Sequence, residues 1–186
     1  MKGFDLAASA IYDFDFVALM QALNAQPELV TEVDINGDTL LMIASIVGSP
    51  VLVKLLLKSG SNIDHQNNVG NSPLFEAALL GHISVAGLLI DAGCNVNLQN
   101  YESETALTAA TAWSHYTLVE LLVASNAEIL HRINGGDTAL SLAIQQGSGE
   151  AVSLMLGHLD AAEKNTGSKI KGPAQVPELP RFNVEK

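Results

Sequence analysis

Apolar and polar positions along the chain recur with a period of 33 residues over four copies. Each copy begins with a hydroxyl residue, has a leucine two positions later and an alanine five positions later, and carries two long apolar residues after sixteen and seventeen positions. The hydroxyl residues are Thr39, Ser72, Thr105 and Thr138, and the alanines are Ala44, Ala77, Ala110 and Ala143. The apolar pairs are Leu55 and Leu56, Leu88 and Leu89, Leu121 and Leu122, and Leu154 and Met155. A repeat of this length predicts a solenoid of stacked supersecondary units.

Within each copy the pattern predicts two short helices. The hydroxyl residue is suited to the N-cap of the first helix, where its oxygen accepts a hydrogen bond from a free backbone N–H. The first helix then ends at a residue that permits a tight reversal, namely Gly48, Gly81, Ser114 or Gly147. The leucine-rich second helix ends at Gly60, Gly93 or Asn126, and a turn follows at Gly37, Gly70, Ser103 or Gly136. The sequence therefore predicts an all-α chain of helix-turn-helix pairs.

These residues resemble the ankyrin repeat, whose period is also 33 residues. The second copy, Gly70-Asn71-Ser72-Pro73-Leu74-Phe75-Glu76-Ala77, is the most similar to the family signature G-x-T-P-L-H-x-A. The resemblance covers about residues 34–160 and implies an ankyrin-repeat solenoid with β-hairpin-like loops between the helix pairs. The signature histidine is replaced in every copy, and we expect each loss to remove local hydrogen bonds. The replacing residues are Met42, Phe75, Thr108 and Ser141.

The repeat phase divides the chain into six segments. Four ankyrin repeats are expected at 34–66, 67–99, 100–132 and 133–160. Residues 1–33 are interpreted as a degenerate capping repeat, with Leu6, Ala7, Ile11 and Tyr12 on one helix and Phe14, Val17, Leu19, Met20 and Leu23 on a second. Residues 161–186 contain several glycines and prolines and are expected to be irregular. Two interpretations of this tail remain open, a plain terminus or a segment that covers the last repeat and the acidic body.

Charge and hydropathy narrow the classes of partner. The net charge is −11, and an acidic body disfavours nucleic acid and favours a basic partner surface. The apolar run from Leu40 to Leu57 could be mistaken for a membrane span, but the repeat phase places a helix reversal at Gly48. Asp5, Asp13 and Asp15 interrupt any signal-peptide core. We therefore expect a cytoplasmic monomer without a membrane partner.

Catalytic and metal chemistry find no support in the sequence. The only cysteine, Cys94, occupies a position that calls for a small buried residue, which predicts an inert thiol. Four of the five histidines recur in repeat phase, so we interpret them as structural: His82 with His115, and His65 with His131. No metal-ligand spacing, nucleophile elbow or phosphate-binding glycine loop is present. The expectation is a chain without enzymatic activity, metal or cofactor.

The ankyrin resemblance implies that a partner binds at the hairpin tips and on the outward side of the first helices, which form a concave face. We expect an aromatic and aliphatic centre with an acidic rim there. The candidate partner-binding residues are Val69, Glu76, Leu79, Leu80, Tyr101, Glu102, Glu104, Trp113 and Asp137. The alternative is that Leu80 and Trp113 only pack against each other. The predicted function is a protein-binding module with an adaptor, inhibitor or immunity-type role. A second possibility is a self-associating scaffold that assembles through the last repeat or the tail.

Overall fold

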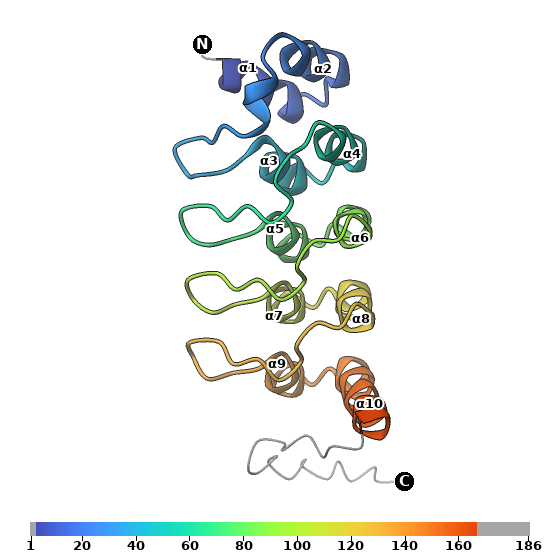
Figure 1. Ribbon diagram of the computed structural model, residues 1–186. Coiled ribbons are helices and arrows are strands. Elements are labelled where there is room, and N and C mark those ends of the chain that lie inside the picture. The colour runs from blue at the N-terminus through green and yellow to red at the C-terminus, as the bar shows by residue number, and fades with distance from the viewer. Residues whose placement is uncertain (1–2, 167–186) are drawn as a thin grey trace, which may run out of the picture.

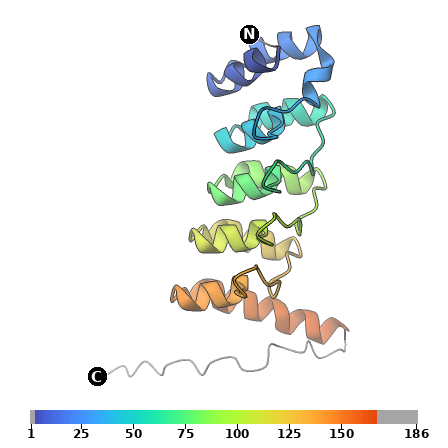
Figure 2. The ribbon, with the colours of Figure 1, turned by 90° about the vertical axis from the view of Figure 1, so that its left-hand side faces the viewer.

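The computed structural model describes residues 3–166 and consists there of ten α-helices and one short 3-10 helix. The α-helices form five antiparallel pairs that stack in layers, as Figures 1 and 2 show. One helix of each pair is called the inner helix and the other the outer helix. The inner helices are α1 (Gly3–Tyr12), α3 (Leu40–Val47), α5 (Pro73–Leu79), α7 (Ala106–Ala112) and α9 (Ala139–Gln145). The outer helices are α2 (Phe16–Ala25), α4 (Pro50–Lys58), α6 (Ile83–Asp91), α8 (Tyr116–Ala124) and α10 (Gly149–Thr166), and η1 (Pro27–Val30) follows α2.

Four hairpin-like loops, here called fingers, connect each outer helix to the next inner helix. Fingers 1 to 4 comprise residues 33–39, 66–72, 99–105 and 132–138, and they all project from the same side of the stack (Figure 1). The base of finger 1 is closed by an antiparallel bridge between Val33 and Thr39. The all-α solenoid that the sequence predicts, with hairpin-like loops, is therefore confirmed.

The predicted N-caps are present at the start of inner helices α3, α5, α7 and α9. Each hydroxyl oxygen accepts the backbone N–H of the third helical residue, as Thr39 does from Met42 at 3.3 Å. In α7 and α9 the bonding is reciprocal, because the side chains of Thr108 and Ser141 accept the backbone N–H of the capping threonine at 2.8 Å. The expectation that losing the signature histidine only removes hydrogen bonds was therefore wrong for these two repeats. A threonine or serine at that position forms a capping box instead.

The positions expected to adopt the left-handed conformation do so, whether or not they hold glycine. Ser103 and Ser114, which replace a repeat glycine, both have φ of 59°, and Asn126 has φ of 63°. An L-residue with a Cβ atom adopts this conformation at a cost of about 1 kcal/mol or more. The repeat geometry therefore determines the backbone at these positions even where the side chain opposes it.

The histidines in repeat phase join neighbouring layers. The Nε2 atoms of His82 and His115, near the start of outer helices α6 and α8, lie 2.9 and 3.2 Å from the carbonyl oxygens of Ile46 and Leu79 in the preceding layer. In the loops, His65 and His131 make the corresponding bonds to the carbonyls of Gly37 and Ser103, both at 2.8 Å. Because each carbonyl can only accept, the ring Nε2–H donates. The predicted structural role of these four histidines is confirmed.

The contribution of one of these histidine hydrogen bonds to the free energy of unfolding can be measured with two glycine substitutions. Gly81 and Gly147 have φ of 77° and 70°, so alanine introduces similar backbone strain at each. A Cβ atom at Gly81 would lie 2.8 Å from His115 Cε1, whereas a Cβ atom at Gly147 meets no atom within 4 Å. We expect Gly147→Ala to lower the free energy of unfolding by about 1 kcal/mol. Gly81→Ala should lower it by a further ~1–2 kcal/mol, because His115 must leave the Leu79 carbonyl. Urea denaturation of both variants tests this, and equal losses would contradict the role of His115.

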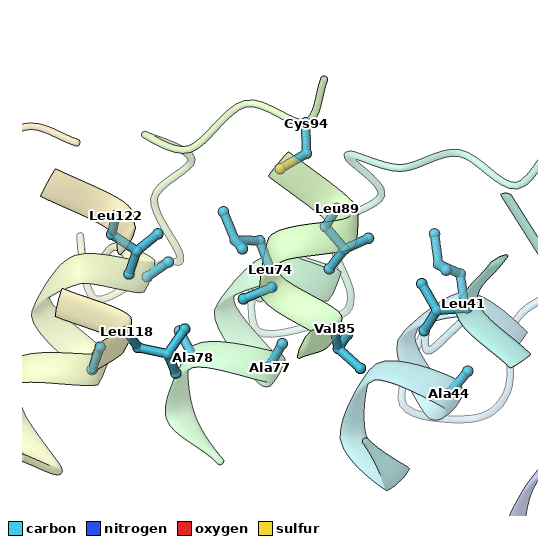
Figure 3. Close-up of a cluster of buried hydrophobic side chains, with 14 of the residues drawn as sticks. Leu41, Ala44, Leu74, Ala77, Ala78, Val85, Leu89, Cys94, Leu118 and Leu122 are labelled. Atoms are coloured by element: carbon cyan, nitrogen blue, oxygen red, sulfur yellow. The ribbon is translucent and has the colours of Figure 1, made fainter. Parts of the chain in front are cut away.

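The core is a continuous layer of leucine and alanine between the inner and outer helices. Leu74, Leu89, Leu118 and Leu122 lie in it together with alanines of the inner helices (Figure 3). The repeat alanines Ala44, Ala77, Ala110 and Ala143 are fully buried, which allows neighbouring inner helices to approach closely. Cys94 is buried at the edge of this core, and burial, aided by the nearby Asp64, raises the pKa of its thiol to about 12. A thiol with this pKa stays protonated and unreactive at neutral pH, as predicted.

The first layer has the two helices expected of a capping repeat, and the sequence-based expectation differs from the structure at Phe14 and in the length of α10. In the first layer Ala7, Ile11, Leu19 and Leu23 are buried, but Leu6, Tyr12, Val17 and Met20 are exposed. Phe14, expected on the second helix, lies in the turn before α2, because Asp15 caps that helix by accepting the N–H of Ala18. No further layer stacks on α1 and α2 within the described residues, so side chains on that side remain in contact with solvent. At the other end α10 continues to Thr166, and the rest of the expected irregular tail lies outside the described residues.

The apolar run from Leu40 to Leu57 forms two helices, as predicted. Helix α3 ends at Val47, and α4 begins at Pro50, whose missing N–H suits the first helical position. Among the helices of residues 3–166, none is long and apolar enough to cross a bilayer.

Candidate functional site: the finger face

Hydrogen bonds between consecutive fingers hold the four fingers in one row. The backbone N–H near the tip of each finger donates to a carbonyl of the finger before it. These bonds join Asn68 to Asn36 at 3.0 Å, Tyr101 to Val69 at 3.1 Å and Asn134 to Glu102 at 3.1 Å. The fingers and the solvent-facing sides of the inner helices together form the surface called here the finger face. Its backbone is fixed, so a partner would meet a preformed surface.

Each of the first three fingers is also braced internally by an Asp or Asn side chain. Asp34, Asn67 and Asn100 each accept two backbone N–H groups of their own finger, at 2.8 to 3.1 Å. Finger 4 has Ile133 at the equivalent position, and there Asp137 accepts from Ser141 Oγ and Gln145 Nε2 instead. Finger 4 is therefore tied to its inner helix through Asp137, and its internal brace is a hydrogen bond from Arg132 Nη1 to the Gly136 carbonyl at 2.8 Å.

The apolar candidates form two rows rather than one cluster. Val69 and Tyr101 lie at fingertips and are 56% and 72% exposed, and a Cβ atom at Gly70 would lie 2.8 Å from Tyr101 Cδ1, so the ring rests on the preceding finger. Leu80 and Trp113 directly follow the last residues of α5 and α7 and are 45% and 65% exposed. The seven-residue helix α7, about 10 Å long at 1.5 Å per residue, separates Tyr101 from Trp113. Leu79 is half-buried, and its carbonyl accepts from His115.

The acidic candidates differ in exposure. Glu102 is exposed, Glu104 and Asp137 are half-buried, and Glu76 is only 8% exposed. The expectation that Glu76 contributes to a solvent-facing rim was therefore wrong. Its side chain points back to the base of finger 2, where Oε1 accepts from Asn71 Nδ2 at 2.8 Å.

A chain of amides links these carboxylates across two fingers. Asn71 Oδ1 accepts from Asn100 Nδ2 at 3.1 Å, and the same Nδ2 donates to Glu104 Oε2 at 2.9 Å. Amide donors bind a carboxylate without cancelling its charge. The finger face therefore keeps a net negative field. The fingers and inner helices, residues 33–47, 66–80, 99–113 and 132–146, include one basic residue, Arg132, and six acidic residues: Asp34, Asp38, Glu76, Glu102, Glu104 and Asp137.

The buried Glu76 makes stability depend on pH. Burial raises the pKa of its carboxyl, the Asn71 amide opposes this, and nearby Asp38 raises the pKa further. A folded-state pKa above the unfolded value gives stability that is full below the unfolded pKa and is lost as pH rises through the folded pKa. Glu76→Gln keeps an oxygen for Asn71 but removes the charge, so we expect this variant to melt higher than wild type at pH 7. The gap should narrow as pH falls toward the ordinary glutamate range.

Thermal unfolding at several pH values measures that gap. Glu102→Gln is the matched control, because Glu102 is exposed and its removal should leave the pH dependence of the melting temperature unchanged. A Glu76→Gln variant that is no more stable than wild type at pH 7 would show that the amide network fully offsets the burial of the charge.

Sequence reasoning did not predict the groove at the N-terminal end of the finger face. Ile35, at the tip of finger 1, is 93% exposed, and Val33 beside it is also exposed. These residues border an open groove against α1, where the described residues of the first layer include no finger.

The finger face offers binding groups rather than reacting groups. Within residues 3–166 no group of three or more histidine, cysteine, aspartate or glutamate side chains could hold a metal ion. Four histidines are occupied by carbonyl bonds, and the Cys94 thiol is buried and protonated. What remains exposed is a set of aromatic, aliphatic and acidic side chains on a rigid frame.

Comparison with protein families assigns this architecture. A family model described as ankyrin repeats, in three copies, matches residues 5–100 and again residues 88–168. A comparison with curated proteins gave no match. The two family matches together span all five layers and each of the four fingers. The chain therefore belongs to the ankyrin repeat family.

Proposed function

We propose that the protein binds a partner protein through the finger face and acts without enzymatic activity as an adaptor, an inhibitor or an immunity-type protein. Ankyrin repeats are generally modules for protein–protein interaction and are typically not enzymes. The observation that supports this surface is the pair of exposed aromatics, Tyr101 and Trp113, on a hydrogen-bonded frame. Large, rigid aromatic side chains contribute most to binding energy at protein interfaces.

The charge of the finger face selects the kind of partner. Its carboxylates accept hydrogen bonds from amides, and its fingers and inner helices carry six acidic residues against one basic residue, Arg132. Such a field attracts a basic surface and speeds its association, and repels nucleic acid. The partner in this proposal therefore presents basic residues around an apolar patch, and the complex forms in the cytoplasm.

Self-association through the last repeat has less support. In α10 the large side chain Met155 is fully buried and Leu154 is half-buried, whereas Leu156 is exposed. One exposed leucine is ordinary for a protein surface and does not make an apolar patch.

Site-specific photocrosslinking tests the proposal. A benzophenone amino acid replaces Trp113 in one variant and the exposed Glu120 of outer helix α8 in another, and crosslinked proteins are identified by mass spectrometry. We expect one basic protein to crosslink from position 113 and not from position 120, and the purified protein to bind with an affinity that falls as salt rises. A partner captured only from position 120 would contradict the proposed surface.

A further inference from the structure

A groove lies at the N-terminal end of the finger face, where no finger stands before finger 1 within the described residues. The groove has a volume of about 710 Å³ and lies between α1 and finger 1. Phe4 and Ile43 are buried at its base, Ala8 is half-buried, and the exposed Tyr12 and Val33 border it. In the other layers a preceding finger occupies the equivalent space, as Figure 1 shows for fingers 2 to 4.

The ladder of hydrogen bonds between fingers is incomplete at this groove. Asn68, Tyr101 and Asn134 occupy one repeat position, and each donates its backbone N–H to the finger before it. Ile35 is the equivalent residue of finger 1, and no finger precedes it within residues 3–166. Among these described residues its N–H has no acceptor, so a carbonyl group of another molecule could accept it.

The charge of the groove indicates which kind of side chain a bound molecule would present to it. Glu32, Asp34 and Asp5 line the groove, and among residues 3–166 no lysine or arginine lines it. Asp34 already accepts N–H bonds from Asn36 and Asp38 but keeps its negative charge. A lysine or arginine side chain next to an apolar one would match both the acidic edge and the apolar base.

We propose that this groove binds a short segment of the partner protein in which a basic residue adjoins an apolar one. The apolar side chain packs over Phe4 between Tyr12 and Val33. The basic side chain pairs with Glu32 and Asp34, and a backbone carbonyl accepts the N–H of Ile35. This inference rests on the proposed function and adds a specific contact to it.

The chain's own residues 167–186 are the competing occupant, because they also contain basic and apolar residues. Helix α10 ends in the last layer, at the opposite end of the stack from the groove (Figure 1). Four layer spacings of about 10 Å amount to ~40 Å along the stack alone. The 16 residues from 167 to 182 span at most ~55 Å when fully extended. Reaching Phe182 into the groove would leave little slack and cost most of the segment's conformational entropy, so the proposal commits to an external partner.

The probe is a displayed library of random twelve-residue peptides, from which peptides that bind the full chain are selected. The groove variant combines Glu32→Lys with Ile35→Asp, and both residues are exposed, so the fold should persist. Glu120→Lys on α8 is the matched charge control. We expect peptides with a basic residue beside an apolar one to be enriched. Their affinity, measured by fluorescence anisotropy, should fall at least about 30-fold on the groove variant and stay unchanged on Glu120→Lys.

The other outcomes are separable. Peptides that depend on Tyr101 and Trp113 but not on the groove would overturn this inference and leave the proposed function standing. Enrichment of sequences that copy residues 167–186 would assign the groove to the chain's own tail and also overturn it. If the groove variant loses binding and also melts at a lower temperature, the loss of binding could come from unfolding. The single variant Glu32→Lys separates the two causes, because we expect it to lose binding without a lower melting temperature. If no peptide depends on any of these residues and crosslinking from position 113 also fails, both proposals are wrong.

Discussion

Replacing Tyr101 and Trp113 together with alanine is expected to weaken binding of the partner protein about 100-fold. The two side chains are the most exposed aromatics of the finger face, and each stands on a rigid part of the frame. Truncating an aromatic side chain that anchors an interface costs about 2 kcal/mol or more, although such losses are not additive. A combined loss of ~3 kcal/mol corresponds to about two orders of magnitude in the dissociation constant. Titration calorimetry with the purified partner measures it.

The structure also predicts how the single variants should behave. Because helix α7 lies between Tyr101 and Trp113, we expect the two side chains to contact different parts of the partner, so that their single-variant losses add to within ~0.5 kcal/mol. Melting temperatures should change little, because both side chains are exposed. Full affinity in the double variant would contradict a role for either row of apolar residues.

The largest expected loss of stability comes from Leu122→Ala. Leu122 on α8 is fully buried in the core shown in Figure 3. Removing a buried leucine costs about 2–5 kcal/mol, because the neighbouring layers close the cavity only in part. For a chain of this size ~3 kcal/mol lowers the melting temperature by about 6–12 °C. Differential scanning calorimetry measures the change.

Leu80→Ala is the matched control, since it makes the same substitution on the finger face. Leu80 is 45% exposed, so its loss should cost less than ~1 kcal/mol of stability but should weaken partner binding. The two variants should therefore have opposite phenotypes. Leu80→Ala should keep its stability and bind the partner more weakly, whereas Leu122→Ala should lose stability and still bind the partner. A Leu80→Ala variant as unstable as Leu122→Ala would place Leu80 in the core.

The repeat itself could be predicted from the sequence because its determinants are local. A capping hydroxyl, a glycine in the left-handed conformation and a leucine pair each act within a few residues, and four copies in phase exclude chance agreement. Even Ser103 and Ser114 could be placed in left-handed turns, since each occupies the repeat position that holds glycine in the other copies. The alanine and histidine positions followed from the same alignment.

The features that could not be predicted from the sequence depend on the direction in which a side chain points and on which elements pack beside it. Sequence phase places Glu76 near the finger face, but only the rotamer and its Asn71 partner show that it turns inward. The pattern predicts the helix between Tyr101 and Trp113, but the expectation of one aromatic centre did not take into account that this helix separates them. The exposure of Val17 and the groove beside Ile35 both follow from a missing neighbour, which a repeat pattern does not display.

Mapping the interface by amide chemical shifts in the complex tests the finger face most directly. The isotope-labelled chain is titrated with the unlabelled partner, and shift changes are assigned to fingers, inner helices and outer helices. The largest changes are predicted at the tips of fingers 2 and 3 and at Leu80 and Trp113, with α4, α6 and α8 nearly unaffected. Changes concentrated on these outer helices, with the fingers unaffected, would contradict binding through the finger face.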